Sequence, residues 1–82
     1  PKTVKSIVDG AFRSNSCLRY IQINEGLKSI GKFAFAFCYN LEDIIIPKTV
    51  RNIGYGAFMG CLISNQRKKE IISRFGKEVF GE

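Results

Sequence analysis

Few side chains in this sequence could take part in chemistry. The 82-residue chain has three cysteines, Cys17, Cys38 and Cys61, and no histidine. No two cysteines have the two-residue spacing that is typical of zinc and redox motifs. Without histidine, acid–base or nucleophilic catalysis would need paired carboxylates, a lysine or an activated thiol. The sequence therefore predicts no metal site and no cofactor site.

One pair of acids and one glycine-rich segment remain as candidates for catalysis. Glu42 and Asp43 are adjacent in a stretch with strand character, where neighbouring side chains point to opposite faces, so their carboxylates do not converge. The segment Gly54-Tyr55-Gly56 lacks the lysine and hydroxyl residue that follow in a phosphate-binding loop. We therefore expect a protein that is not an enzyme.

Composition and charge restrict the class of protein further. An apolar fraction of 45% with 24% charged residues indicates a folded globular domain. The net charge of +6 allows attraction to nucleic acid, acidic glycans or acidic proteins without selecting among them. No apolar run approaches the roughly 18 residues of a membrane span, and the start of the chain lacks the apolar core of a signal peptide. Because the first residue is Pro1, we expect a processed chain or a piece of a longer protein.

The sequence repeats itself every 23 residues. The segments VKSIVDGAF, LKSIGKFAF and VRNIGYGAF begin at Val4, Leu27 and Val50, and PKTV at 1–4 returns at 47–50. Isoleucine, alanine and phenylalanine each form a column through the three segments: Ile7, Ile30 and Ile53; Ala11, Ala34 and Ala57; Phe12, Phe35 and Phe58. Such a period predicts a solenoid, in which each coil buries its apolar side by stacking on its neighbours.

Each repeat contains two stretches with strand character and one turn. The runs at 18–23 and 41–46 are short and rich in β-branched residues, so we expect strands of a parallel sheet. The VKSI-type runs predict second extended segments, which turn at Gly31 and Gly54 in two of the three repeats. After them, we expect a tight turn in which alanine fits a narrow gap and phenylalanine fills the interior.

The repeat register ends after Cys61. The positions that should next be apolar hold Ser64, Arg67 and Lys69. Instead, the segment 64–76 predicts a helix of roughly two to three turns, since it has a Ser64 or Asn65 N-cap candidate, apolar residues at helical spacing and a terminal glycine. We thus predict repeats over 1–61, the last incomplete, and a helical cap over 62–82 whose apolar side, helped by Val79 and Phe80, covers the last coil.

No comparable segment covers the first coil, where Val4, Ile7 and Phe12 would line an open face. Two explanations remain at this point. Further repeats precede Pro1 in the natural protein, or two chains associate end to end.

The cysteines fit the repeat as well. Cys38 and Cys61 occupy equivalent positions in successive coils, where their Cβ vectors run parallel, which is poor geometry for a disulfide. We expect them to be buried and reduced. Cys17 is shifted from that column by two residues, with Asn15 in its place, and we expect it to be more exposed.

The columns follow the pattern V/L-x-x-I-G-x-x-A-F-x-x-C-x-x-L-x-x-I-x-I-P, which resembles the BspA-like, or treponemal, class of leucine-rich repeats over residues 1–61. The resemblance implies an elongated right-handed α/β solenoid of three coils with short parallel strands, closed by a C-terminal helix. It also implies a cell-surface or secreted protein with a role in adhesion, and no catalytic residues. Val8 in place of the corner glycine and Asn24 in place of proline depart from the pattern, so the first coil is expected to be looser.

Two surfaces are candidates for binding a partner. The first is the open face of the 18–23 and 41–46 strands, where the alternation points four side chains away from the core: Tyr20, Gln22, Asp43 and Ile45. An exposed aromatic and an exposed aliphatic residue are typical interface anchors, although ordinary surface residues would give the same pattern.

The second surface is a basic strip formed by Lys5, Lys28 and Arg51, which fall in one column. It suits sulfated glycans or acidic protein surfaces, and it equally suits a solvated face that discourages aggregation. The cluster at 67–69 invites a nucleic-acid hypothesis, but the polar face of a helix explains it better and no nucleic-acid-binding motif is present. The sequence thus favours a non-catalytic module that binds a protein or glycan, with a structural spacer or oligomerisation unit as the alternative.

Overall fold

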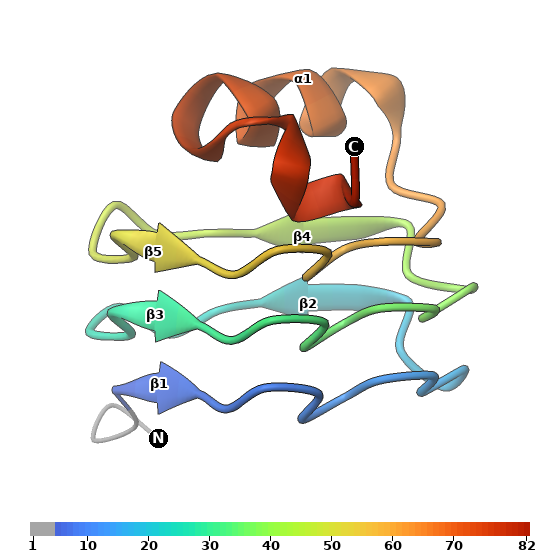
Figure 1. The fold of residues 1–82 in the computed structure, drawn as a ribbon, viewed down its shortest axis with the longest axis horizontal. Coiled ribbons are helices and arrows are strands. Elements are labelled where there is room, and N and C mark those ends of the chain that lie inside the picture. The colour runs from blue at the N-terminus through green and yellow to red at the C-terminus, as the bar shows by residue number, and fades with distance from the viewer. Residues whose placement is uncertain (1–4) are drawn as a thin grey trace.

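The computed structural model describes residues 5–82, so the predictions for Val4 and for the first PKTV segment, at 1–4, lie outside the described residues. Its elements in chain order are β1 (Ser6–Ile7), β2 (Tyr20–Gln22), β3 (Ser29–Ile30), β4 (Asp43–Ile45), β5 (Asn52–Ile53), the helix α1 (Asn65–Phe75) and the 3-10 helix η1 (Lys77–Phe80). Figure 1 shows the strands at successive levels, with α1 across one end of the stack and β1 at the other.

The strands form two parallel sheets, with the order β1-β3-β5 in one and β2-β4 in the other. Ser6 pairs with Ser29 and Ser29 with Asn52, so partners are 23 residues apart (29 − 6 and 52 − 29), which is the period of the sequence. The predicted short parallel strands are therefore confirmed. They are shorter than the apolar runs at 18–23 and 41–46, because the chain turns a corner on either side of each strand.

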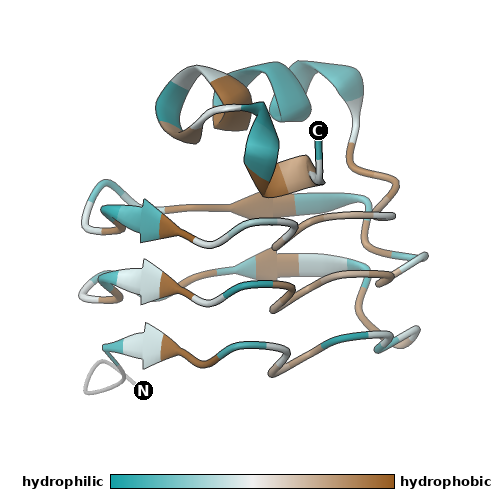
Figure 2. Cartoon of the chain, in the orientation of Figure 1, coloured by the Kyte–Doolittle hydropathy of each residue, from teal (hydrophilic) through white to brown (hydrophobic). Residues whose placement is uncertain are grey.

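The apolar core lies between the two sheets, and Figure 2 shows apolar segments recurring at corresponding places in successive levels. A stack of phenylalanine rings runs through it. The Phe12 and Phe35 centroids are 5.2 Å apart, and those of Phe35 and Phe58 are 5.6 Å apart. Phe35 and Phe58 are fully buried, but Phe12 is 38% exposed because its outer ring face has no neighbour in the described residues. The phenylalanine column is thus core, except at its first member.

The tight turns need left-handed backbone at two positions in each repeat. Glycine supplies this conformation at Gly10 and Gly56, with φ of 67° and 66°, but the second repeat uses Phe33 (φ 56°) and Phe37 (φ 60°). Each non-glycine residue in this region costs on the order of 1 kcal/mol. The guanidinium carbon of Arg13 lies 5.8 Å and 5.5 Å from the two ring centroids, a cation–π contact that offsets part of the strain.

The corner glycines allow successive repeats to approach closely. A Cβ atom on Gly31 would lie 2.5 Å from the backbone nitrogen of Asp9, and one on Gly54 would lie 2.5 Å from that of Lys32. Val8 occupies the corresponding corner of the first repeat and is 69% exposed. Its side chain is accommodated there because no described residue packs against that side of the first repeat.

The C-terminal helix predicted from the sequence is present as α1. Ser64 is its N-cap, and the Ser64 hydroxyl accepts a hydrogen bond from the Arg67 backbone nitrogen at 3.4 Å. Ile71 is the buried residue of the helix and joins the core, and the Gly76 N–H donates to the Ile72 carbonyl at the C-terminal end. The helix therefore packs through one apolar face.

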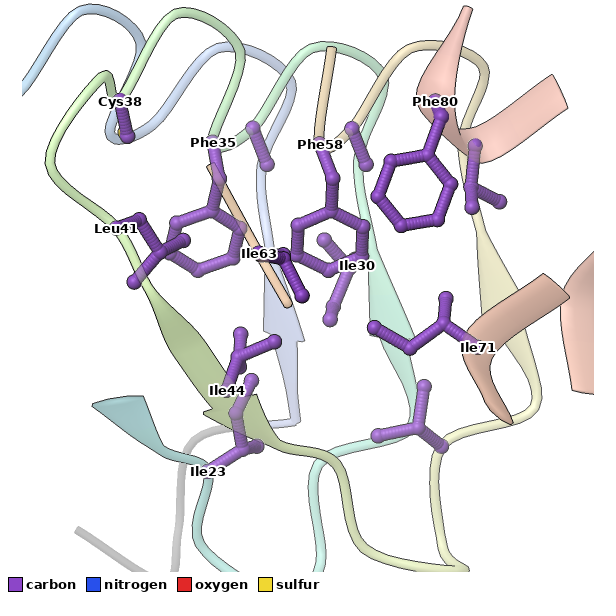
Figure 3. Packing of buried hydrophobic residues seen from close by; sticks show 14 of the residues in the cluster. Ile23, Ile30, Phe35, Cys38, Leu41, Ile44, Phe58, Ile63, Ile71 and Phe80 are labelled. Carbon is purple, nitrogen blue, oxygen red and sulfur yellow. The ribbon is translucent and has the colours of Figure 1, made fainter. Parts of the chain in front are cut away.

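The 3-10 helix η1 continues the pattern of the repeats. Between repeats, the Phe35 N–H donates to the Ala57 carbonyl at 2.8 Å; at the end of the stack, the Phe58 N–H donates to the Val79 carbonyl at the same distance. The ring of Phe80 lies 5.8 Å from that of Phe58. Figure 3 shows Phe35, Phe58 and Phe80 side by side. A four-residue segment thus occupies the place of another phenylalanine turn, at an offset of 22 residues (80 − 58) rather than 23.

Candidate functional site

The four residues predicted on the open strand face lie together in the structure. Tyr20, Gln22, Asp43 and Ile45 line one hollow of about 300 Å³ on the outer side of β2 and β4, and we call this surface the strand face. Tyr20 is 69% exposed and Ile45 is 43% exposed, whereas Ile44 between the outward residues of β4 is fully buried. The strand face therefore offers one aromatic and one aliphatic side chain to solvent beside polar groups.

An ion pair borders Tyr20. The Arg19 guanidinium donates to a Glu42 carboxylate oxygen at 3.0 Å, and the hydroxyl of Tyr20 donates to the other oxygen at 3.4 Å. The hydrogen bond and charge of Glu42 raise the pKa of Arg19. Glu42 thus restrains the Tyr20 ring while leaving its faces open to a partner.

Asp43 differs from the other members of the strand face, because its carboxylate is already bonded within the chain. Its Oδ1 accepts hydrogen bonds from the Arg67 Nε at 2.8 Å and from the Ile44 backbone nitrogen at 2.9 Å. The Arg67 hydrogen bond lowers the pKa of Asp43, so the carboxylate stays ionised well into the acid range. Asp43 therefore positions α1 against β4, a role that the strand pattern alone does not indicate.

A groove that the sequence did not predict lies between β4 and α1, with a volume of about 520 Å³ and a mainly apolar lining. We call it the helix groove; isoleucines and basic residues define it: Ile45, Ile46, Ile71, Arg67, Lys69 and Arg74. Ile45 also lines the hollow of the strand face, so the two surfaces adjoin. The spacing of Arg67, Ile71 and Arg74 at i, i+4 and i+7 is the sequence signal that could have placed them on one side of a helix.

The outer edge of β4 is bonded by the C-terminal segment. The Ser64 backbone nitrogen donates to the Glu42 carbonyl at 3.3 Å, and Arg74 donates from Nη1 to the Ile46 carbonyl at 2.8 Å. Ser64 and Arg74 thus form hydrogen bonds with carbonyl groups next to β4 that a further strand would otherwise bind. A partner at this place would contact side chains rather than extend the sheet.

The residues of the predicted basic strip form a column at the edge of the other sheet, where they directly precede β1, β3 and β5. The Lys28 N–H donates to the Lys5 carbonyl and the Arg51 N–H donates to the Lys28 carbonyl, each at 2.8 Å, so the three residues occupy adjacent levels. All three side chains are exposed, and none belongs to an ion pair among residues 5–82. They do not line the hollow over β1-β3-β5.

The cysteines act as structural donors. The Cys38 thiol donates to the Phe12 carbonyl at 3.0 Å, and the Cys61 thiol donates to the Phe35 carbonyl at 3.1 Å. Burial raises the pKa of Cys38, and it raises that of Cys61 to about 12, so neither forms the reactive thiolate near neutral pH. All three cysteines are free. Cys38 is buried and Cys17 is exposed as expected, but Cys61, which was expected to be buried, is only partly buried.

The basic cluster at 67–69 is largely used within the chain. Arg67 pairs with Asp43 and also with Glu70 at 2.7 Å. Lys68 pairs with Glu82 at 3.3 Å and lies over the Phe80 ring at 5.0 Å. Among these three residues, only Lys69 belongs to no ion pair of the described residues, so the cluster itself offers little basic surface to nucleic acid.

The described residues hold no group of three or more His, Cys, Asp or Glu side chains arranged to bind a metal ion. The two adjacent acids of the sequence, Glu42 and Asp43, bind separate arginines and do not face a common point. Within residues 5–82, the helices are all too short or too polar to cross a membrane.

An apolar hollow of about 280 Å³ lies at the open end of the stack, opposite α1. Its lining includes Ile7, Phe12, Leu18 and Ile23. This is the face on which the sequence left two explanations open, further repeats or a second chain.

Comparison with known proteins gives one result. The family model described as BspA type Leucine rich repeat region (6 copies) matches residues 1–82. The match extends past residue 61, where the internal repeat of the sequence ends, to the last residue of the chain. Searches of curated proteins and of solved structures found no match.

Proposed function

The chain belongs to the BspA-type leucine-rich repeat family, and from this premise we propose that it is a non-catalytic binding module of a cell-surface or secreted protein, with a role in adhesion. Repeats of this family are typically non-catalytic, and leucine-rich repeats commonly bind proteins. The family is also associated with surface or secreted proteins. The partner we propose is a protein.

The architecture we propose for this role is a solenoid of three 23-residue coils over 1–61, closed by a helical cap over 62–82. Pairing at a 23-residue offset supports the coil, and the packing of Ile71 and Phe80 into the core supports the cap. A solenoid of this kind presents one strand face along its length, which is the surface that repeat proteins commonly use for partners.

One observation carries the binding proposal: Tyr20, Gln22 and Ile45 line a single hollow together with Asp43. Exposed aromatic and aliphatic side chains at the centre of a contact, with polar groups around them, are the usual anchors of protein interfaces. The Arg19–Glu42 pair at the margin of the hollow restrains Tyr20 and thereby lowers the entropy lost on binding.

The test compares two double substitutions of matched chemistry. Tyr20→Ala with Ile45→Ser removes the anchors of the strand face. Tyr39→Ala with Leu62→Ser removes another exposed aromatic residue and another exposed aliphatic residue, 58% and 68% exposed, that lie outside the hollow. Both variants are first checked for native circular dichroism.

We expect the wild-type chain and the control variant to capture the same protein from an extracellular extract. The strand-face variant should bind that protein at least about tenfold more weakly, which corresponds to a loss of about 1.4 kcal/mol of binding free energy. Equal capture by all three proteins would contradict the proposal.

An acidic glycan is the alternative ligand, through Lys5, Lys28 and Arg51. Replacing all three residues with glutamine should abolish retention on heparin if the basic strip binds glycans. Unchanged retention would remove the glycan alternative.

The apolar hollow at the open end favours a second candidate function, that of a structural spacer or oligomerisation unit. On this alternative the chain associates end to end through Ile7 and Phe12, which partly line that hollow. Sedimentation over a concentration series separates the two functions. A monomer at all concentrations would remove the oligomerisation alternative and leave the binding proposal untouched.

A further inference from the structure

We propose that the helix groove binds an acidic protein segment, with aliphatic side chains of the partner on the isoleucine floor and a carboxylate at Lys69 and Arg74. The inference rests on the proposed function, since it specifies the chemistry of the partner that the adjoining strand face would bind. Three features of the groove support it: its apolar floor, the charges that remain unpaired at its rim, and its position.

The floor is suited to aliphatic side chains. Ile45 at the end of β4, Ile46 directly after it and Ile71 of α1 line a groove of about 520 Å³. Ile45 is exposed and Ile46 is partly buried, so both still offer apolar surface to a partner. Removing such surface from water favours association with an apolar side chain. A sulfated glycan has few apolar groups to place on this floor, and the basic strip beside the other sheet suits it better.

The charge at the rim is positive and unpaired. Asp43 and Glu70 neutralise the charge of Arg67. Glu70 is the one acidic residue that lines the groove, and its charge is therefore already paired. Lys69 and Arg74 belong to none of the ion pairs formed by residues 5–82. Arg74 donates from its two terminal nitrogens to the Ile46 and Pro47 carbonyls, so its charge is held at the rim without an acidic partner. Two cations beside an apolar surface favour a carboxylate next to an aliphatic side chain, and the net charge of +6 attracts acidic partners over longer distances.

The position of the groove joins it to the strand face. Ile45 lines both hollows, so a partner segment anchored at Tyr20 could continue across Ile45 into the groove without leaving the surface. The backbone edge of β4 is partly bonded there by Arg74. Recognition in the groove would thus depend on side chains and charge.

The test uses three fluorescent ten-residue peptides. The first alternates glutamate with leucine or valine, the second replaces glutamate with lysine, and the third replaces the apolar residues with serine. Binding is measured by fluorescence anisotropy, and contact residues are identified from amide chemical shifts of the ¹⁵N-labelled chain.

We expect only the first peptide to bind, with shifts centred on Ile45, Ile46 and Lys69. Lys69→Glu should weaken this binding at least about tenfold. Lys28→Glu, which changes the net charge equally but lies beside the other sheet, should weaken it less than about twofold. Arg74 is left unchanged because it also holds the Ile46 carbonyl.

Several results would overturn the inference: equal loss from Lys28→Glu and Lys69→Glu, equal binding of the serine peptide, or shifts confined to other surfaces. Heparin binding that Lys69→Glu abolishes, without peptide binding, would assign the groove to a glycan instead. If capture of the extracellular protein requires Tyr20 and Ile45 but not Lys69, the helix-groove inference fails while the proposed function stands. If capture is indifferent to Tyr20 and Ile45, the proposed function itself fails.

Discussion

Replacing Phe80 with alanine should destabilise the chain far more than the same substitution at Phe12. Both rings belong to one stack, but they lie at opposite ends of it. Phe80 is 9% exposed, packs against Phe58 and lies under the Lys68 ammonium group, 5.0 Å from the ring centroid. Phe12 contacts Phe35 on one side and is 38% exposed. The comparison therefore isolates the contribution of the C-terminal segment to the core.

The expected magnitudes follow from burial. A buried phenylalanine truncated to alanine costs about 3–5 kcal/mol, so we expect a loss in this range for Phe80→Ala. Full burial of such a side chain is worth about 1.5–3 kcal/mol, and Phe12 realises only part of it, so we expect about 1–2 kcal/mol for Phe12→Ala. A chain of this length has a free energy of unfolding of about 4–12 kcal/mol.

The measurement is urea unfolding followed by far-ultraviolet circular dichroism, with linear extrapolation to water. We expect the Phe80 variant to lose about 2 kcal/mol more than the Phe12 variant. A loss at Phe80 equal to or smaller than that at Phe12 would refute the conclusion that η1 takes the place of another repeat in the core.

Three further predictions concern the corners, the helix contact and the thiols. Gly54→Ala should cost more than about 2 kcal/mol in urea unfolding, because the new Cβ would lie 2.5 Å from the Lys32 backbone nitrogen; a near-neutral effect would show that the corner can open. The hydrogen bond from Arg67 holds the pKa of Asp43 below its ordinary value of 3.8. The ionised Asp43 therefore contributes its full stability above pH 3.8, and this stability is lost as the pH falls through the lowered pKa of the folded state. The difference in unfolding free energy between wild type and Asp43→Asn, on the order of 0.5–1 kcal/mol at neutral pH, should accordingly shrink in acid, and a constant difference would contradict this reasoning. In the native protein, iodoacetamide should modify Cys17 well before Cys61, because the Cys61 thiol donates a hydrogen bond to a carbonyl and its pKa is raised to about 12. Equal rates of modification, measured by mass spectrometry, would contradict a structural role for the Cys61 thiol.

The periodic part of the fold could be predicted from the sequence. The isoleucine column that contains Ile30 and the phenylalanine column that contains Phe35 identify the core, because stacked repeats bury the same position at each level. Alternation along the strands likewise indicated that Tyr20 and Ile45 point outward, as they do. These inferences need only the spacing of residue types, which repeats within this one sequence.

The C-terminal segment was harder to predict because its contacts do not follow the period. Phe80 joins the phenylalanine stack at an offset of 22 residues and from a 3-10 helix, so it falls outside the 23-residue columns. The bond from Arg67 to Asp43 depends on how α1 lies across β4, which helical spacing does not specify. The helix groove arises from that same placement, and only its helix side had a sequence signal.

The most direct test of the central claim, that the strand face binds a protein, is photocrosslinking at single positions. A benzophenone amino acid is placed at Tyr20 or Ile45, or, as a matched control, at Tyr39 or Leu62, and each chain is irradiated in the same extracellular extract. We expect covalent capture of one protein from positions 20 and 45 and little or none from positions 39 and 62. Capture from the control positions alone, or none from the strand face when the wild type binds, would contradict it.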